Sequence, residues 1–142
     1  MVTGMDGRQE RAASAFVWSP GGWFGAQLGS TLWLLILGCV LLRRDATGGA
    51  LCLGGWALLN AWGGLLWSRR GRLDPYAAFQ LFLGAASLVF AAVVLVLRDR
   101  GLSEHPLAGG AVSTYLPLWV IALAPALMLV FFLRERSVRR SA

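Results

Sequence analysis

The side chains best suited to chemistry in this sequence are three carboxamides, Gln27, Asn60 and Gln80, each of which lies in a long uncharged segment. If these segments are membrane helices that rise about 1.5 Å per residue, all three side chains lie roughly 8–12 Å below the same membrane surface. Pro125, in a fourth such segment, lacks a backbone donor at a similar depth and frees the carbonyl of Ile121. We therefore predict one interhelical polar layer, which either joins the helices or forms a site for a ligand or an ion.

Ionisable groups are missing from all four uncharged segments, and the single histidine, His105, lies between the third and the fourth. Proton-coupled transporters and ion relays almost always carry an ionisable group inside the membrane, so this absence argues against a proton-driven pump. Cys39 and Cys52 lack metal-ligand spacing, and we interpret both as small buried hydrophobic residues. The sequence also lacks a nucleophile–base pair, a carboxylate dyad and a phosphate-binding loop. We expect no catalytic residue, no metal ion and no cofactor.

Four apolar segments must position these side chains, and their lengths predict helices that span a membrane. Hydrophobic residues make up 57% of the 142 residues and charged residues 14%, against about 25% charged residues in a typical soluble domain. Each segment has roughly 20 or more residues without a charge, enough to cross about 30 Å of hydrocarbon. The expected fold is all-α, an integral membrane four-helix bundle over residues 20–134, with spans of about 21–42, 47–67, 75–97 and 111–133. Residues 1–19 are expected to form a flexible cytoplasmic tail and residues 135–142 a basic one.

The arginines predict the orientation of these spans. All 13 basic residues are arginines, of which nine lie on one side of the predicted spans and four on the other. Positive charge collects in short cytoplasmic loops, so we expect both termini in the cytoplasm, and the membrane to be a bacterial inner membrane. Trp18, Trp23 and Trp67 then fall at the cytoplasmic interface, where indole rings prefer to lie. Nucleic acid is not an expected partner, because the arginines stand at the ends of apolar segments, as the membrane charge rule requires.

A basic cluster follows the last span, and it allows two interpretations. Its members are Arg134, Arg136, Arg139 and Arg140. They either bind anionic lipid head groups or act as a stop signal that sets the topology.

Small residues form one face of the first span, where Gly21, Gly25 and Gly29 repeat every four residues. Such a face lets another helix backbone approach closely. The approach is expected either within the bundle or between two copies of the chain.

The first two spans resemble the last two in the order of their landmarks. Gln27 and Trp56 recur as Gln80 and Trp119, with arginines at corresponding helix ends. A duplication would relate the two helix pairs by an axis along the membrane normal.

Several short fragments, spread over about half of the chain, form a tryptophan-rich pattern. They are Trp23-Phe24-Gly25, Thr31-Leu32-Trp33-Leu34-Leu35 with Gly38, Leu58-Leu59-Asn60 with Trp62, Arg69-Arg70, and Pro117 with Trp119. This pattern resembles the tryptophan-rich sensory protein / translocator protein family. The sequence departs from that family by lacking its first of five helices, by placing Trp62 one residue closer to Asn60, and by having Leu118 in place of a tyrosine. The resemblance implies binding of porphyrin or another flat hydrophobic molecule, with Trp33, Asn60 and Trp62 near the pocket.

These observations predict a small, non-catalytic integral membrane protein that is either an assembly subunit of a membrane complex or a binder of a hydrophobic ligand. The candidate ligand-binding residues are Gln27, Asn60, Gln80, Trp33 and Trp62. A dimeric pore or facilitative transporter is the competing class, but it would need a continuous polar stripe, and the sequence offers a single polar layer. The expected partners are the lipid bilayer and either further copies of the chain or a larger membrane complex.

Overall fold

The structure, a computed structural model, describes residues 16–101 and 111–141. Its four helices are α2 (Pro20–Leu41), α3 (Ala46–Ser68), α4 (Pro75–Asp99) and α5 (Ala111–Ser141). The predicted all-α fold is therefore confirmed for this part of the chain. Most of the expected tail over residues 1–19, and the segment with His105, lie outside the described residues.

Three of the helices begin where a side chain can accept a hydrogen bond from the first turn. The acceptors are Ser19 for α2, Asp45 for α3 and Asp74 for α4, at 3.1, 3.2 and 3.1 Å. Such caps satisfy backbone donors that have no partner inside the helix. Pro20 and Pro75 directly follow two of the caps, at the first helical position, where a missing N–H is tolerated.

The last helix is longer than the sequence suggested. Residues 135–142, which we expected to form a basic tail, continue α5 as far as Ser141. The physical reason lies in the composition of this stretch, which has three arginines and a glutamate but neither glycine nor proline to end the helix.

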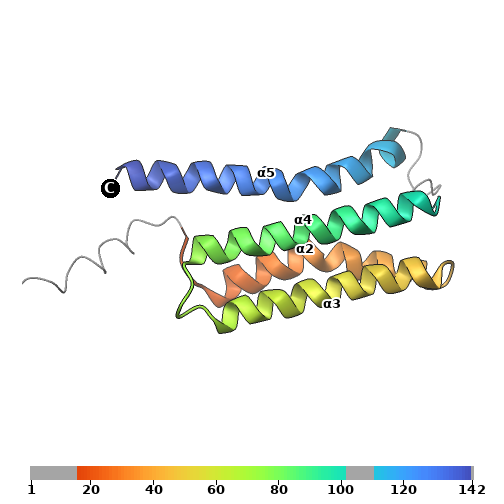
Figure 1. Cartoon of the computed structure of the whole chain (residues 1–142), viewed down its shortest axis with the longest axis horizontal. Helices are drawn as coiled ribbons and strands as arrows, with labels where there is room; N and C mark the ends of the chain where they lie inside the picture. The colour runs from red at the N-terminus through yellow and green to blue at the C-terminus, as the bar shows by residue number, and fades with distance from the viewer. Residues whose placement is uncertain (1–15, 102–110, 142) are drawn as a thin grey trace, which may run out of the picture.

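Consecutive helices pack side by side among the described residues: α2 on α3, α3 on α4, and α4 on α5 (Figure 1). Large rings connect α2 to α4, because Trp33 meets Phe90 at a centroid distance of 5.1 Å and Trp23 meets Phe82 at 6.1 Å. The expected four-helix bundle is thus a bundle of α2, α3 and α4, with α5 lying along α4 at its edge.

The core has two parts along the bundle axis. One part is formed by Leu34, Leu41, Cys52, Leu59, Ala86, Phe90, Val93 and Leu97, and the other by Trp23, Leu66, Ala78 and Phe82. On the buried face of α2, the polar residues Gln27 and Thr31 come between Trp23 of one part and Leu34 of the other. Cys52 is buried as expected, but Cys39 is exposed on α2, so the interpretation of both cysteines as buried is wrong for Cys39.

Glycines bring α2 and α3 close together at positions outside the repeat of Gly21, Gly25 and Gly29. A methyl group added at Gly38 would meet the side chain of Leu53 at 2.8 Å, and one at Gly49 would meet the backbone nitrogen of Leu42 at 2.6 Å. Gly63 packs in the same way against the carboxamide of Gln27. These positions therefore need a hydrogen in place of a side chain.

The face with Gly21, Gly25 and Gly29 points outward instead. All three residues are exposed, and an added methyl group would meet nothing within 4 Å in the described part of the chain. The expectation that these glycines pack within the bundle is therefore wrong. The first span is apolar on every side, so its sequence did not reveal which side faces its neighbours.

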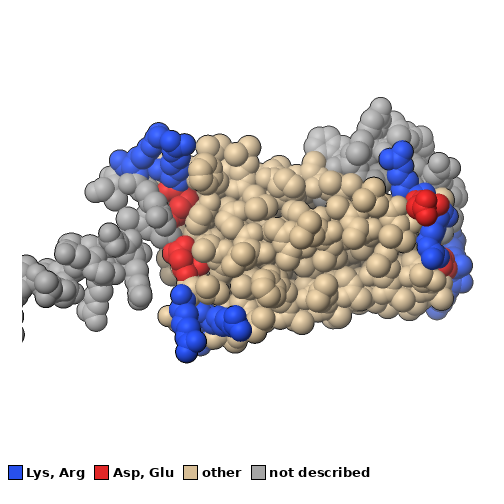
Figure 2. Space-filling view, viewed as in Figure 1, with Lys and Arg blue, Asp and Glu red and all other residues tan. Residues whose placement is uncertain are grey.

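The surface of the molecule is divided into an apolar middle and two charged ends. Figure 2 shows the arginines and acidic residues of the described chain gathered at the ends, with uncharged residues between them. On α2, Phe24, Leu28, Leu32, Ile36 and Val40 are exposed at four-residue intervals. The helices α2, α3 and α4 are long and apolar enough to cross a membrane.

Candidate functional site

Two of the three predicted carboxamides meet inside the bundle. Gln27 is buried, and its Nε2 donates to both the backbone carbonyl and the Oδ1 of Asn60, each at 3.0 Å. Asn60 Nδ2 in turn donates to Thr31 Oγ1 at 3.2 Å and to the carbonyl of Trp56 at 2.8 Å. The Thr31 hydroxyl donates to the carbonyl of Gln27 at 2.9 Å. We call Gln27, Thr31 and Asn60 the amide network, and it joins α2 to α3.

Almost every polar atom of the amide network has a partner. Both N–H groups of each carboxamide donate, and the exception is Gln27 Oε1, which is buried without a hydrogen-bond partner among the described residues. The Gln27 carboxamide lies directly against Gly63. The contacts of the network are therefore those of a joint between two helices, with protein atoms filling the space beside it.

The third carboxamide has a different partner. Gln80 is half-buried, and its Nε2 donates to the backbone carbonyl of Met128 on α5 at 3.1 Å. The prediction that α5 contributes the carbonyl of Ile121 is thus wrong, because Gln80 reaches a carbonyl about two turns further along. The expected single layer is divided into one bond set between α2 and α3 and another between α4 and α5.

The two tryptophans singled out by the sequence lie in different parts of the core. Trp33 packs on Phe90 in the part that includes Leu34. Trp62 packs against the part that includes Trp23, and its Nε1 is buried without a hydrogen-bond partner in the described chain. The structure therefore does not gather Trp33, Asn60 and Trp62 around one cavity.

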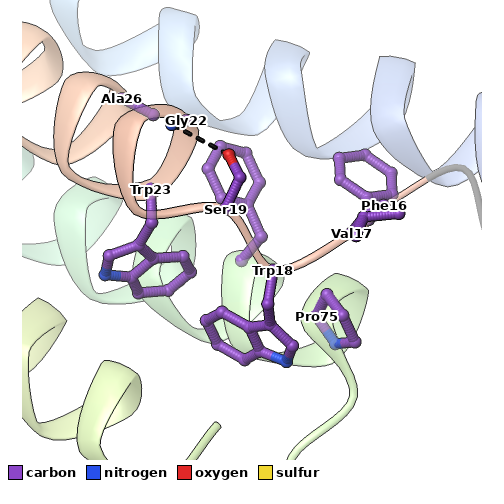
Figure 3. A pocket seen from close by; sticks show the side chains of 9 residues that line it. Phe16, Val17, Trp18, Ser19, Gly22, Trp23, Ala26 and Pro75 are labelled. Atoms are coloured by element: carbon purple, nitrogen blue, oxygen red, sulfur yellow. Dashed lines mark hydrogen bonds between the residues drawn. The ribbon is translucent and has the colours of Figure 1, made fainter.

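A pocket of about 280 Å³ lies elsewhere, where residues 16–19 cross the beginnings of α2 and α4 (Figure 3). We call it the aromatic pocket, and all of its lining residues are uncharged. They include Phe16, Trp18, Ser19, Trp23, Pro75 and Phe79. Residues 16–19, which we had placed in a flexible tail, thus form one wall of the pocket.

The rings of the aromatic pocket are fixed by stacking and by hydrogen bonds. Trp18 meets Trp23 at a centroid distance of 5.0 Å and Trp67 at 5.5 Å. The indole N–H of Trp18 donates to the carbonyl of Leu73 at 3.3 Å, and that of Trp23 to the carbonyl of Gly63 at 3.2 Å. Since these N–H groups are already bonded, the rings offer the pocket mainly apolar surface and π-faces.

Part of the aromatic pocket could be predicted from the sequence. Trp18 and Trp23 were expected at the membrane interface, but nothing indicated that Phe16 and Phe79 join them. Phe16 lies 6.0 Å from Phe79 and 5.4 Å from Phe131 between ring centroids, so it links three separate segments of the chain. A run of aromatic residues just before the first span is the signal that could have revealed the pocket.

The predicted lipid-binding arginines stand on the last turns of α5. Arg134, Arg136 and Arg140 are exposed, and the side chain of Arg139 lies outside the described residues. No group of three or more His, Cys, Asp or Glu side chains comes together in residues 16–101 and 111–141.

Comparison of the chain with models of protein families, with curated proteins and with solved structures gives no match.

Proposed function

We propose that this chain is an integral membrane protein that crosses the bilayer four times, with both termini in the cytoplasm, and that it works by binding and not by catalysis. The exposed apolar middle between two charged ends supports the membrane location. The nine-to-four division of arginines supports the orientation. At the end with more arginines, the guanidinium of Arg70 lies 5.0 Å from the ring centre of Trp67, a pairing suited to an interface between lipid and water.

The ligand that we propose is a flat, mainly hydrophobic molecule such as a porphyrin, with part of its ring system seated in the aromatic pocket. The observation that carries this proposal is the set of rings from three segments, Phe16 and Trp18 before α2, Trp23 in α2 and Phe79 in α4, around one opening. Aromatic side chains in offset or edge-to-face contact favour a flat partner. Small-molecule sites are typically concave, largely apolar and preformed, as this pocket is.

The test compares two tryptophan variants in purified protein in mild detergent. Trp18→Leu removes a ring of the aromatic pocket, whereas Trp33→Leu removes a ring that only the family resemblance would put near a ligand. Binding of protoporphyrin IX, followed by its own absorbance, should weaken about tenfold in Trp18→Leu, the loss of roughly one good stacking contact. It should be unchanged in Trp33→Leu. Equal loss in both variants, or no binding to the unmodified protein, would contradict the proposal; melting curves check that both variants fold.

A second candidate function is that of an assembly subunit, favoured by the open face of α2. Gly25 and Gly29 leave room there for a closely packed helix from a partner chain. In this case Gly25→Leu should reduce the particle size in detergent without lowering the melting temperature, because Gly25 is exposed and a Cβ added there would meet nothing within 4 Å in the described chain. If the particle size does not change, this face contacts lipid and not a partner chain, which would contradict the second candidate function.

A further inference from the structure

The last turns of α5 carry an amphipathic strip that has no role in the aromatic pocket. A shallow, open depression on this helix is lined by Leu133, Arg136, Ser137 and Arg140. Their spacing of three, four and seven residues puts them on one face. Leu129 and Val130, both more than half exposed, precede them on the same face. The strip therefore runs from apolar side chains to a pair of guanidinium groups.

The charges around this strip are unbalanced. The single acidic residue between positions 129 and 142 is Glu135, which is only 4% exposed. Neither Arg136 nor Arg140 is part of an ion pair within the described chain. Figure 2 shows the basic groups at the end of α5 standing out from the body of the molecule.

The opposite end of the molecule gives a contrast. There Arg100 pairs with Asp45 at 3.3 Å, and Asp99 lies next to it in the sequence. Attraction to the negative end of the helix dipole explains an arginine in the last turn of α5, such as Arg140, but the effect fades within that turn and does not account for Arg136. Among residues 16–101 and 111–141, the two arginines of the strip thus lack a partner of the kind that Arg100 has.

We propose that this strip, Leu129, Val130, Leu133, Arg136, Ser137 and Arg140, binds one anionic phospholipid. Arg136 and Arg140 would bind the phosphate and the anionic head group, since guanidinium groups form paired hydrogen bonds with phosphate oxygens. An acyl chain would lie along Leu133, Val130 and Leu129. The inference rests on the membrane location proposed above and not on the aromatic pocket.

The test measures which lipid the full-length protein keeps. Protein in mild detergent is mixed with equal amounts of dioleoyl phosphatidylglycerol and dioleoyl phosphatidylcholine, and the retained lipid is counted by native mass spectrometry. We expect phosphatidylglycerol to be enriched, and the enrichment to fall roughly five-fold for each arginine removed, or about 25-fold in Arg136→Gln/Arg140→Gln. The matched control at the other end, Arg43→Gln/Arg98→Gln, should keep the enrichment, and so should Trp18→Leu, which tests the aromatic pocket separately.

Two further arms identify the source of the phosphate and the role of the apolar residues. Inorganic phosphate at the same concentration should not raise the melting temperature, whereas phosphatidylglycerol should. Leu133→Asn should weaken retention of the dioleoyl lipid more than that of a short-chain phosphatidylglycerol. Equal retention of the two head groups, equal loss in the control pair, or stabilisation by phosphate alone would overturn the proposal.

Discussion

The first and the last pair of consecutive helices, α2 with α3 and α4 with α5, are held together in different ways. Between α2 and α3, glycines bring the backbones close, and the amide network closes the gap with several hydrogen bonds. Between α4 and α5, Gln80 bonds the carbonyl of Met128, and the rings of Phe79 and Phe131 lie 5.1 Å apart. The first pair thus relies on backbone proximity and on a network, and the second on separate side-chain contacts.

This difference matters for the membrane location that we propose, because lipid is as apolar as the helices themselves. Apolar residues gain little by leaving lipid for a helix interface, so close packing and hydrogen bonds must provide the attraction. The pair α2 and α3 has close backbone packing and several hydrogen bonds. It should therefore be more stable than the pair α4 and α5, and less tolerant of substitution. Substitutions in the two helix pairs should therefore lower the melting temperature by different amounts.

The largest effect is expected where two backbones touch. Gly49→Ala would push a methyl group against the backbone of Leu42, which cannot move without opening the turn between α2 and α3, and should cost about 1–3 kcal/mol of stability. Gly84→Ala in α4 meets nothing within 4 Å in the described chain and should be neutral or stabilising by up to about 1 kcal/mol. Thermal melting in detergent measures both. Similar melting temperatures for the two variants would refute the proposed closeness of the first pair.

The amide network should show the next largest effect. Asn60→Leu removes its hydrogen bonds with Gln27 and Thr31 and leaves a buried carboxamide short of a partner, which should cost about 1–2 kcal/mol. Ala61→Leu, on the neighbouring exposed position, is the control and should have little effect. If the network only joins helices, porphyrin binding per folded molecule will be unchanged in Asn60→Leu. A loss of binding with normal melting would instead give Asn60 a role in ligand recognition.

A smaller effect is expected in the second helix pair. Gln80→Leu removes one side-chain hydrogen bond to Met128, and such bonds contribute about 0.6 kcal/mol on average within membranes. Leu88→Ala, at a highly exposed position of the same helix, serves as the control for a change in lipid contact. A cost as large as that of Asn60→Leu would remove the distinction between the two pairs.

The smallest effect belongs to the ion pair at the end away from the aromatic pocket. Arg100 and Asp45 are 41% and 20% exposed, so Arg100→Gln should cost less than about 1 kcal/mol, and the cost should shrink as salt is raised from 0.05 to 0.5 M or so. Arg100 is the residue to change, because Asp45 also caps α3. Arg43→Gln is the control, and an equal, salt-independent loss in both variants would mean that the pair contributes nothing specific.

The sequence predicted where each residue lies along its helix axis better than it predicted which face of each helix points into the bundle. Charges and apolar length located α2 and α4 to within a few residues, and they put Gln27 and Asn60 at one level, where the structure joins them. The helix ends and the depths of these side chains follow from counting residues, because an α-helix rises by a constant distance per residue. Depth could therefore be derived from one sequence.

Rotation could not be derived in this way, because the spans are apolar on every side and have no polar face to mark the outside. The prediction consequently left Gly25 and Gly29 facing either the bundle or a second copy of the chain, whereas in the structure they face outward and Gly38 packs against α3. The partner of Gln80 was missed for the same reason. The aromatic pocket needed contacts between residues 16–19 and α4, and although the aromatic residues before the first span were visible in the sequence, their partner Phe79 was not.

The pairing of each helix with its predecessor has a consequence for biosynthesis. Within the described chain, α3 packs on α2, α4 on α3, and α5 on α4, so every new helix finds its neighbour already made when it leaves the ribosome. Contacts that are short in sequence also form quickly, because little chain entropy is lost in closing them. The protein can thus be assembled in the order of translation, and a chain halted before α5 would already have every partner that its first three helices use with one another.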